Sequence, residues 1–219
     1  MNDELDTQDE KFGPMLEQIK GLFFEFGIKN LNMDDISRKL GISKKTLYRF
    51  VKSKEDMIAK LFEYELVQWM KFLDKISNQD VNAIEKLFNV SLFVFEEMQR
   101  FNPMLMFELR KYYEQLFNEH HARRLRHISK SMKLNLEQGI KEGLYRHDVN
   151  IDTVVALYMS YLVEIHSSAD ICKTIDVSFD DLFKVMFENH IRAISTPEGV
   201  VFFEMRKKEI SENLSNNNQ

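Results

Sequence analysis

Seven cations and no acid occupy the segment from Arg38 to Lys54. The cations are Arg38, Lys39, Lys44, Lys45, Arg49, Lys52 and Lys54, in a chain whose formal net charge is −5. Long cationic side chains bind phosphates by replacing the counterions around them, and an arginine can also pair with the edge of guanine. The segment therefore carries a local positive charge that the overall composition conceals, and its chemistry suits a polyanion.

Apolar residues at helical spacing accompany these cations. Residues 33–50 fit two short helices joined by a tight turn, in which Gly41 supplies the turn and Ser43 caps the second helix. Six positions would form their shared core: Ile36, Leu40, Gly41, Ile42, Leu47 and Phe50. This is the helix-turn-helix pattern, whose second helix enters the major groove of DNA. Seven residues on and after that helix are candidate DNA contacts: Lys44, Lys45, Thr46, Tyr48, Arg49, Lys52 and Lys54.

A plainer interpretation is a solvated helix face, which is what most runs of charge on helices are. The spacing of the apolar residues, the central glycine and the lack of acids act together against that interpretation. The sequence therefore favours the helix-turn-helix.

The rest of the chain also has helical patterning. Only 7 glycines and 3 prolines interrupt 219 residues, and no alternation of β-branched residues is long enough to predict a strand. Outside the helix-turn-helix, apolar periodicity predicts helices at about 15–26, 53–78, 82–102, 104–117, 122–139, 152–167 and 178–195. The predicted fold class is all-α, with an N-terminal three-helix domain followed by a larger helical domain.

Four segments follow from these patterns. We expect a disordered acidic tail at 1–12, a helix-turn-helix DNA-binding domain at 13–56, a C-terminal helical domain at 57–210 and a frayed tail at 211–219. The two end segments are polar, and terminal residues fray unless packing holds them.

Composition excludes several classes of protein. The acidic N-terminus lacks the order of a signal peptide, and no apolar run approaches the ~20 residues that span a bilayer, so we expect a cytoplasmic protein with no membrane partner. Cys172 is the single cysteine and cannot form an internal disulfide. Because no phosphate loop, nucleophile motif or metal-ligand set is present, we expect no cofactor, no metal site and no enzyme.

The block GISKKTLYRFVKSKEDM at 41–57 resembles the DNA-binding domain of the TetR family of transcriptional regulators. The stretches GIKEGLYRHDVNID and TPEG also resemble segments around the family's last two long helices. The resemblance implies a homodimer that binds an inverted repeat in double-stranded DNA, with a C-terminal domain for dimerisation and for an unknown small effector. It also implies that Thr46 and Tyr48 touch DNA, that Lys54 contacts a phosphate, and that Lys44, Lys45 and Arg49 set sequence preference.

The chain departs from that family pattern at two places. Lys11 stands almost alone behind the acidic tail, where many relatives carry several basic residues near the DNA backbone. Ser37 replaces the usual alanine, which is acceptable if its hydroxyl bonds a backbone carbonyl of its own helix.

Aromatic and apolar residues of the C-terminal domain suggest two further surfaces. Trp69, Phe95, Phe107 and Tyr112 are candidates for an apolar effector site, because aromatic rings make apolar walls; ordinary core is the alternative. Seven residues are candidates for the dimer interface, with intramolecular core as their alternative: Tyr158, Tyr161, Leu162, Ile165, Phe183, Phe187 and Ile191.

A second cationic cluster contains His120, His121, Arg123, Arg124, Arg126 and His127. Because no carboxylate or cysteine stands at a convincing spacing for a metal, we interpret it as a solvated helix face. A basic patch for an acidic effector or for flanking DNA is the alternative.

Together these features indicate a homodimeric repressor released by a small, largely apolar effector. The alternative is a helical protein-interaction module whose basic segment binds an acidic partner. DNA binding that depends steeply on salt and on sequence would separate the two.

Overall fold

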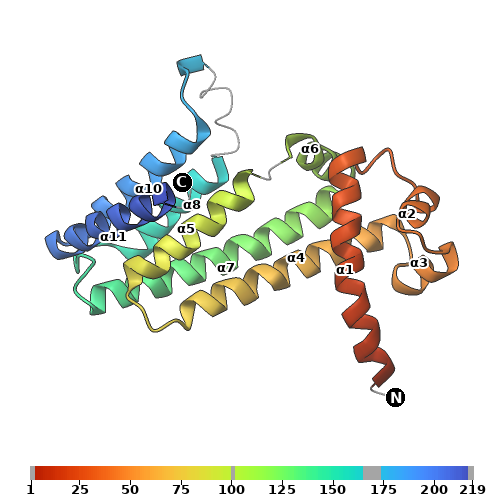
Figure 1. The fold of residues 1–219 in the computed structure, drawn as a ribbon, viewed down its shortest axis with the longest axis horizontal. Coiled ribbons are helices and arrows are strands. Elements are labelled where there is room, and N and C mark those ends of the chain that lie inside the picture. Colours follow the sequence, from red (N-terminus) through yellow and green to blue (C-terminus); the bar gives the residue numbers. More distant parts are fainter. Residues whose placement is uncertain (1–2, 100–101, 165–173, 217–219) are drawn as a thin grey trace. The chain divides into compact units, whose positions relative to one another are not determined.

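The computed structural model describes residues 3–99, 102–164 and 174–216, and its elements there are helices. They are α1 (Asp3–Phe26), α2 (Met33–Lys39), α3 (Lys44–Phe50), α4 (Lys54–Ser77), α5 (Ala83–Gln99), α6 (Pro103–Tyr112), α7 (Glu114–Lys141), α8 (Ile151–Glu164), α10 (Phe179–Ile194) and α11 (Pro197–Asn216) (Figure 1). One isolated antiparallel bridge joins Tyr145 to Ser195. The all-α prediction is confirmed. Among the described residues, no helix combines the length and the apolar character needed to cross a membrane.

The chain divides into two compact units. The first contains Met1–Phe72 and Arg100–Arg124, and the second contains Leu73–Gln99 and Leu125–Gln219. The first unit therefore joins the helix-turn-helix to α1, α6 and the beginnings of α4 and α7. The sequence predicts a boundary at residue 56 between a DNA-binding part and a C-terminal helical part. That division concerns function rather than compactness, and it stays a prediction.

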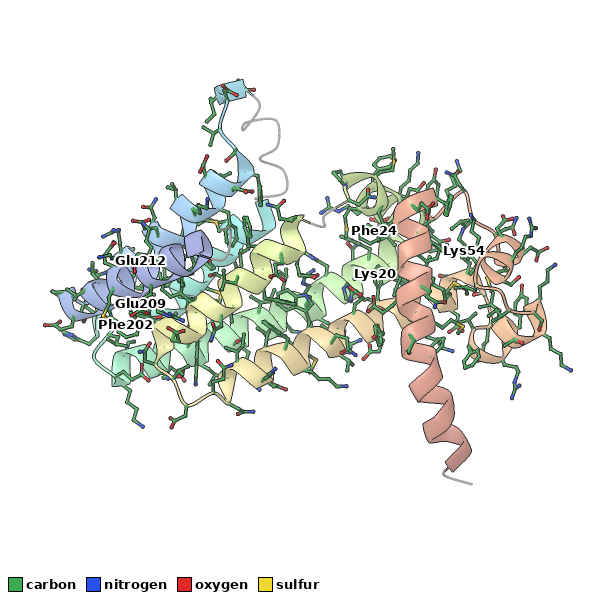
Figure 2. All side chains as sticks on the ribbon, in the orientation of Figure 1. Lys20, Phe24, Lys54, Phe202, Glu209 and Glu212 are labelled. Carbon is green, nitrogen blue, oxygen red and sulfur yellow. The ribbon has the colours of Figure 1, made fainter. Side chains whose placement is uncertain are left out.

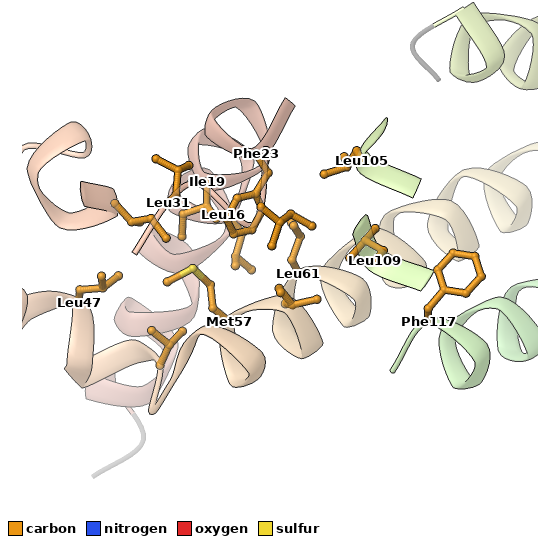
Figure 3. Close-up of a cluster of buried hydrophobic side chains, with 14 residues drawn as sticks. Leu16, Ile19, Phe23, Leu31, Leu47, Met57, Leu61, Leu105, Leu109 and Phe117 are labelled. Carbon is orange, nitrogen blue, oxygen red and sulfur yellow. The ribbon is translucent and has the colours of Figure 1, made fainter. Parts of the chain in front are cut away.

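A buried apolar cluster holds the first unit together (Figure 3). α1 contributes Leu16, Ile19 and Phe23, which are almost fully buried. The same cluster contains Leu47 of α3 and Met57 of α4, together with Leu105 and Leu109 of α6. Burying each such side chain contributes about 1.5–3 kcal/mol. The helix-turn-helix is thus anchored to α1, α4 and α6 by one continuous core.

Three phenylalanines lie at the centre of the second unit. The Phe88 ring of α5 lies 5.4 Å from that of Phe187 of α10 and 5.3 Å from that of Phe203 of α11, centroid to centroid. Around them α5, α10 and α11 pack together (Figure 1). Arg206 of α11 adds a two-pronged bond to Glu85 of α5, at 2.7 and 2.8 Å.

The ends of the chain differ from the predicted tails. α1 begins at Asp3, so helix replaces most of the disordered tail expected at 1–12. Pro14 lies inside this helix, where it removes a single backbone donor. α11 extends to Asn216 and includes part of the frayed tail expected at 211–219.

The boundary between α6 and α7 was also predicted wrongly. The sequence predicted an interruption between Phe117 and Ala122, whereas the chain leaves helical geometry at Tyr113, with φ −137° and ψ 40°. Tyr113 still donates to the carbonyl of Leu109 at 2.9 Å, so the break is a local kink between two helices. No glycine or proline marks that position in the sequence.

Candidate nucleic-acid interface

Helix α2 is fixed by a cap at its start and a glycine after its end. The side chain of Asn32 accepts hydrogen bonds from the backbone N–H groups of Asp34 and Asp35, both at 2.9 Å, and the Asp35 carboxylate accepts one from the Asn32 N–H at 3.2 Å. This reciprocal capping box satisfies donors that the first turn leaves open. Gly41 has a φ of 67°, a conformation that other residues rarely adopt. The turn into α3 therefore depends on glycine.

Helix α3 begins at the predicted serine cap. The Ser43 hydroxyl oxygen accepts a hydrogen bond from the Thr46 N–H at 3.0 Å, and the two hydroxyl oxygens lie 2.8 Å apart. Leu47 is fully buried, while Tyr48 keeps 50% of its surface exposed. The helix thus buries one face in the core and presents the other to solvent.

The candidate DNA contacts occupy two different settings. Five are exposed: Lys44, Lys45, Tyr48, Arg49 and Lys52. Thr46 and Lys54 are half-buried. Among the predicted core residues, Ile36 and Leu47 are buried, Leu40, Ile42 and Phe50 are half-buried against the same cluster, and Gly41 is exposed.

One hydrogen bond within α2 and one ion pair between α2 and α3 help to hold the helix-turn-helix. Ser37 is buried, and its hydroxyl donates to the Asp34 carbonyl at 3.0 Å, the bond that serine at this position requires. Lys44, the first residue of α3, forms an ion pair with the side chain of Asp34 of α2. Because both partners are exposed, the pair contributes less than about 1 kcal/mol, so a DNA phosphate can replace the carboxylate.

Asp56 connects the end of the helix-turn-helix to α4. Its carboxylate accepts a hydrogen bond from the Lys52 N–H at 2.7 Å and lies 3.3 Å from the Lys60 ammonium. Partial burial acts to raise the pKa of Asp56, but these two partners outweigh it and leave the pKa lowered. Ser53 accepts a hydrogen bond from the Asp56 N–H at 3.1 Å and caps α4.

Lys54 contacts the loop between α1 and α2. Its ammonium donates hydrogen bonds to the backbone carbonyls of Ile28 and Leu31. Figure 2 labels Lys54 beside this loop. Burial lowers the pKa of Lys54, whereas the charges of Glu108 and Asp35 act in the opposite direction. An ammonium has three donors, so one remains for a phosphate.

Glu108 of α6 supports the same loop and was missed by the sequence analysis. It is buried, and its carboxylate accepts hydrogen bonds from the backbone N–H groups of Ile28 at 2.6 Å and Lys29 at 3.2 Å. An isolated glutamate within a helical pattern gives no sign that it will reach a loop 80 residues earlier.

The candidate effector residues fall in both units. Trp69 is buried in the first unit, with the Arg124 guanidinium 4.4 Å from its ring centroid. Phe107 and Tyr112 are exposed on α6. Phe95 belongs to the second unit and lies half-buried against Phe183, at 5.5 Å between ring centroids.

The candidate dimer residues are mostly buried within one chain. Tyr158, Phe183, Phe187 and Ile191 are buried, Leu162 is half-buried, and Ile165 lies outside the described residues. Tyr161 is 52% exposed. The structure adds two exposed apolar side chains that the sequence analysis missed, Leu157 at 56% and Val185 at 55%. Leu157 and Tyr161 are four residues apart, which places both on one face of α8.

Known proteins resemble this chain in sequence and in fold. Residues 16–61 match the family model described as bacterial regulatory proteins, tetR family. The chain is 29% identical over 86 residues to the HTH-type transcriptional regulator YvaF of Bacillus subtilis, covering 38% of this chain and 45% of that regulator. It is 26% identical over 147 residues to the HTH-type transcriptional repressor KstR2 of Mycobacterium tuberculosis, covering 65% of this chain and 72% of the repressor.

Among solved structures, the transcriptional regulator FadR of Bacillus subtilis in complex with stearoyl-CoA has a similar fold. The TM-score is 0.60 at 16% identity, over 81% of this chain and 96% of that one. The match thus extends beyond residues 16–61 into the helices that follow.

Proposed function

Because the chain is a DNA-binding transcriptional regulator of the TetR family, we propose that it acts as a homodimeric repressor that a small, largely apolar effector releases from an inverted repeat. The observation that carries this proposal is the exposed face of α3, where lysines, an arginine and Tyr48 stand on a helix fixed by caps and core. In the proposed function this face enters the major groove.

The exposed residues of α3 suit different parts of the DNA. Arg49 can pair with the O6 and N7 atoms of guanine, and Tyr48 can contact a thymine methyl group or a phosphate. Lys44, Lys45 and Lys52 are suited to phosphates, which give affinity without sequence information. The Thr46 hydroxyl lies 2.8 Å from the Ser43 hydroxyl, and in the proposed function Thr46 contacts the backbone of DNA.

The exposed apolar residues of the second unit support a dimer. Leu157 and Tyr161 of α8 and Val185 of α10 are each more than half exposed in the part of the chain that the structure describes, and symmetric packing against a second copy would remove them from water. A two-fold dimer of this kind reads two half-sites about 34–36 Å apart, or a multiple of one helical turn.

The proposed effector carries an apolar chain. Support comes from the aromatic candidate Trp69 of the first unit and from FadR, a protein of similar fold solved with stearoyl-CoA. Release requires that the effector bind more tightly to a dimer whose α3 helices are wrongly spaced, since a ligand without that preference shifts no equilibrium.

Selection from random duplex DNA tests the proposal. The purified protein is incubated with the pool at near-physiological salt, and the retained fraction is sequenced. An enriched inverted repeat is the expected result, and it supplies the operator for effector screening. Weak, salt-sensitive retention without enrichment would instead favour the acidic-partner alternative.

A further inference from the structure

Helix α6 lies beside the C-terminal end of α1 and the loop that follows it (Figure 1). We call residues 27–32, which lead from α1 into α2, the α1–α2 loop. At the start of α6, the Asn102 side chain donates a hydrogen bond to the Phe24 carbonyl of α1 at 3.4 Å. At its end, the Tyr112 ring centroid lies 5.3 Å from the Lys29 ammonium of the loop. All of these residues belong to the first unit, and α6 contacts this segment at both of its own ends.

Between these two contacts, Glu108 of α6 binds two neighbouring backbone N–H groups of the α1–α2 loop. Its Oε2 atom accepts hydrogen bonds from Ile28 at 2.6 Å and from Lys29 at 3.2 Å. Glu108 is buried, and Gly27 leaves room for its close approach, because a Cβ there would lie 3.3 Å from Oε2. Hydrogen bonds to a charged group are the stronger kind, and a buried N–H is costly to leave without an acceptor. The carboxylate therefore fixes the loop firmly on the side that faces α6.

Lys54 of α4 binds the same loop through its carbonyl groups. Its ammonium donates to the backbone carbonyls of Ile28 and Leu31. Ile28 is thus held through both of its backbone polar groups, the N–H by Glu108 and the carbonyl by Lys54. Burial lowers the pKa of Lys54, but the charge of Glu108 acts to raise it and so favours the charged ammonium. The two side chains therefore hold one loop from two different helices.

The α1–α2 loop leads directly into the helix-turn-helix. Its last residue, Asn32, caps α2, and α2 packs against α3. The side chains of Ile28 and Leu31 are buried in the same apolar cluster as Leu47 of α3. A loop fixed at these points limits how far α2 and α3 can tilt on α1. Segments that are already ordered as the complex requires bind more tightly, because binding does not have to order them.

We propose that Glu108 is a positioning residue for DNA binding, which acts from outside the helix-turn-helix by fixing the α1–α2 loop and, through it, α2, α3 and the Lys54 ammonium. Without its carboxylate the loop samples several arrangements, and DNA has to order it on binding. That cost is the same for any sequence, so the loss falls on operator and random DNA alike. The inference rests on the proposed function in taking α3 and Lys54 as the parts that contact DNA.

Variants of Glu108 separate the position of its oxygen from its charge. Glu108→Ala should bind the selected operator and a random duplex about tenfold more weakly than the natural chain, as the loss of one hydrogen bond to a charged group predicts. Glu108→Gln keeps an oxygen that can accept both bonds, since both end on Oε2, and should stay within about threefold. Glu108→Asp keeps the charge but is one methylene too short, so it should lose as much as Glu108→Ala. Fluorescence anisotropy with labelled duplexes measures all three.

A core variant controls for lost stability. Leu66 of α4 is buried in the first unit but outside the apolar cluster that contains Leu47, so Leu66→Ala should destabilise the fold and change DNA affinity by less than about twofold. Binding is measured at a temperature at which thermal melts show every variant folded, and Glu108→Asp replaces Glu108→Ala if the latter does not fold. Natural affinity in the variant used, a loss as large in Leu66→Ala, or a loss as large in Glu108→Gln would overturn the positioning role.

Hydrogen exchange measured without DNA separates this inference from the proposed function. A peptide that covers the α1–α2 loop should exchange faster in Glu108→Ala than in the natural chain or in Leu66→Ala, because its buried N–H groups have lost their acceptor. Equal exchange in all three would overturn the inference even if an operator is selected. If no operator is selected, the proposed function fails, while exchange and the random duplex at low salt still decide the role of Glu108.

Discussion

The carboxylate of Glu108 on α6 accepts a hydrogen bond of 2.6 Å from the backbone N–H of Ile28, at the end of the turn that follows α1. Gly27, with a φ of 79°, makes this approach possible, since an added Cβ would lie 3.3 Å from the Glu108 carboxylate. The Lys54 ammonium donates hydrogen bonds to the backbone carbonyls of Ile28 and Leu31 in the same loop. A helix outside the helix-turn-helix therefore fixes the loop from which α2 begins.

Replacing Glu108 should loosen that loop. In Glu108→Ala the buried Ile28 N–H loses its acceptor, and we expect unfolding free energy to fall by about 2–3 kcal/mol. Urea denaturation measures the change. Glu108→Gln keeps an oxygen acceptor, so its free energy of unfolding should fall clearly less than that of Glu108→Ala. An unchanged midpoint for the alanine variant would show that the bond has no structural role.

Lys54 should contribute both to stability and to DNA binding. Lys54→Ala removes two bonds to loop carbonyls, for a loss of about 1–3 kcal/mol in unfolding free energy. It also removes a proposed phosphate contact and should make the salt slope of DNA binding shallower by about one, equally on all sequences. Exposed Lys45 is the control: its alanine variant should change the slope similarly but stability by less than about 0.5 kcal/mol. A Lys54→Ala protein of normal stability would contradict the dual role.

Tyr48 should act on specificity. Tyr48→Ala is expected to weaken operator binding by about 1–3 kcal/mol while random DNA is bound almost as before. Fluorescence anisotropy with matched operator and scrambled duplexes measures both. Tyr48→Phe keeps the ring, and retained specificity there would assign the contact to the ring rather than to the hydroxyl. Equal losses on the two duplexes for Tyr48→Ala would place Tyr48 among the nonspecific contacts.

Local signals explain which parts of the fold could be predicted from the sequence. Ser43 is followed by a short amphipathic segment, and Gly41 precedes it, so α3 and its turn could be placed by chemistry acting within a few residues. α11 was missed, although Pro197 at its start and the Thr196 hydroxyl, which accepts from the Gly199 N–H at 3.1 Å, are ordinary start signals. The sequence analysis predicted no helix after residue 195.

Contacts between distant residues could not be predicted in this way. Glu108 reaches Ile28 only because core packing brings α6 to the end of α1. The candidate dimer residues illustrate the same limit, since periodicity marks the apolar positions of a helix without distinguishing those that neighbouring helices cover, such as Phe187, from those left exposed, such as Leu157.

Gly139 should be intolerant of any side chain. A Cβ there would lie 2.0 Å from the ring of Tyr145, which is buried and hydrogen-bonded to Asn135 at 3.2 Å. Gly139→Ala is expected to cost about 1–3 kcal/mol through overpacking. Gly21, inside α1, has no such neighbour within 4 Å, so Gly21→Ala should stabilise by about 0.5–1 kcal/mol. Thermal melts of both variants check the prediction, and a loss of similar size in each would refute it.

Stability should fall in mild acid because of a half-buried histidine. His190 of α10 packs on Tyr158 of α8, with ring centroids 4.1 Å apart, and burial lowers its pKa from 6.5 to about 4. The unfolded chain therefore takes up a proton as pH falls below 6.5, whereas the folded chain does not until about pH 4. Since the unfolded state binds more protons in that window, unfolding free energy decreases as pH falls, by about 2 kcal/mol between pH 7 and pH 5.

His190→Phe keeps an aromatic ring against Tyr158 and removes the titrating group. Urea denaturation at pH 7, 6 and 5 should give a smaller loss of stability for this variant than for the natural chain. The stability of His190→Phe should still depend on pH to some extent, because the pKa of His120 is also lowered to about 4 by burial and by its cationic neighbours. Combining His190→Phe with a replacement of His120 should flatten the profile further. Identical profiles for the natural chain and His190→Phe would mean that folding does not lower the pKa of His190 and would contradict the prediction.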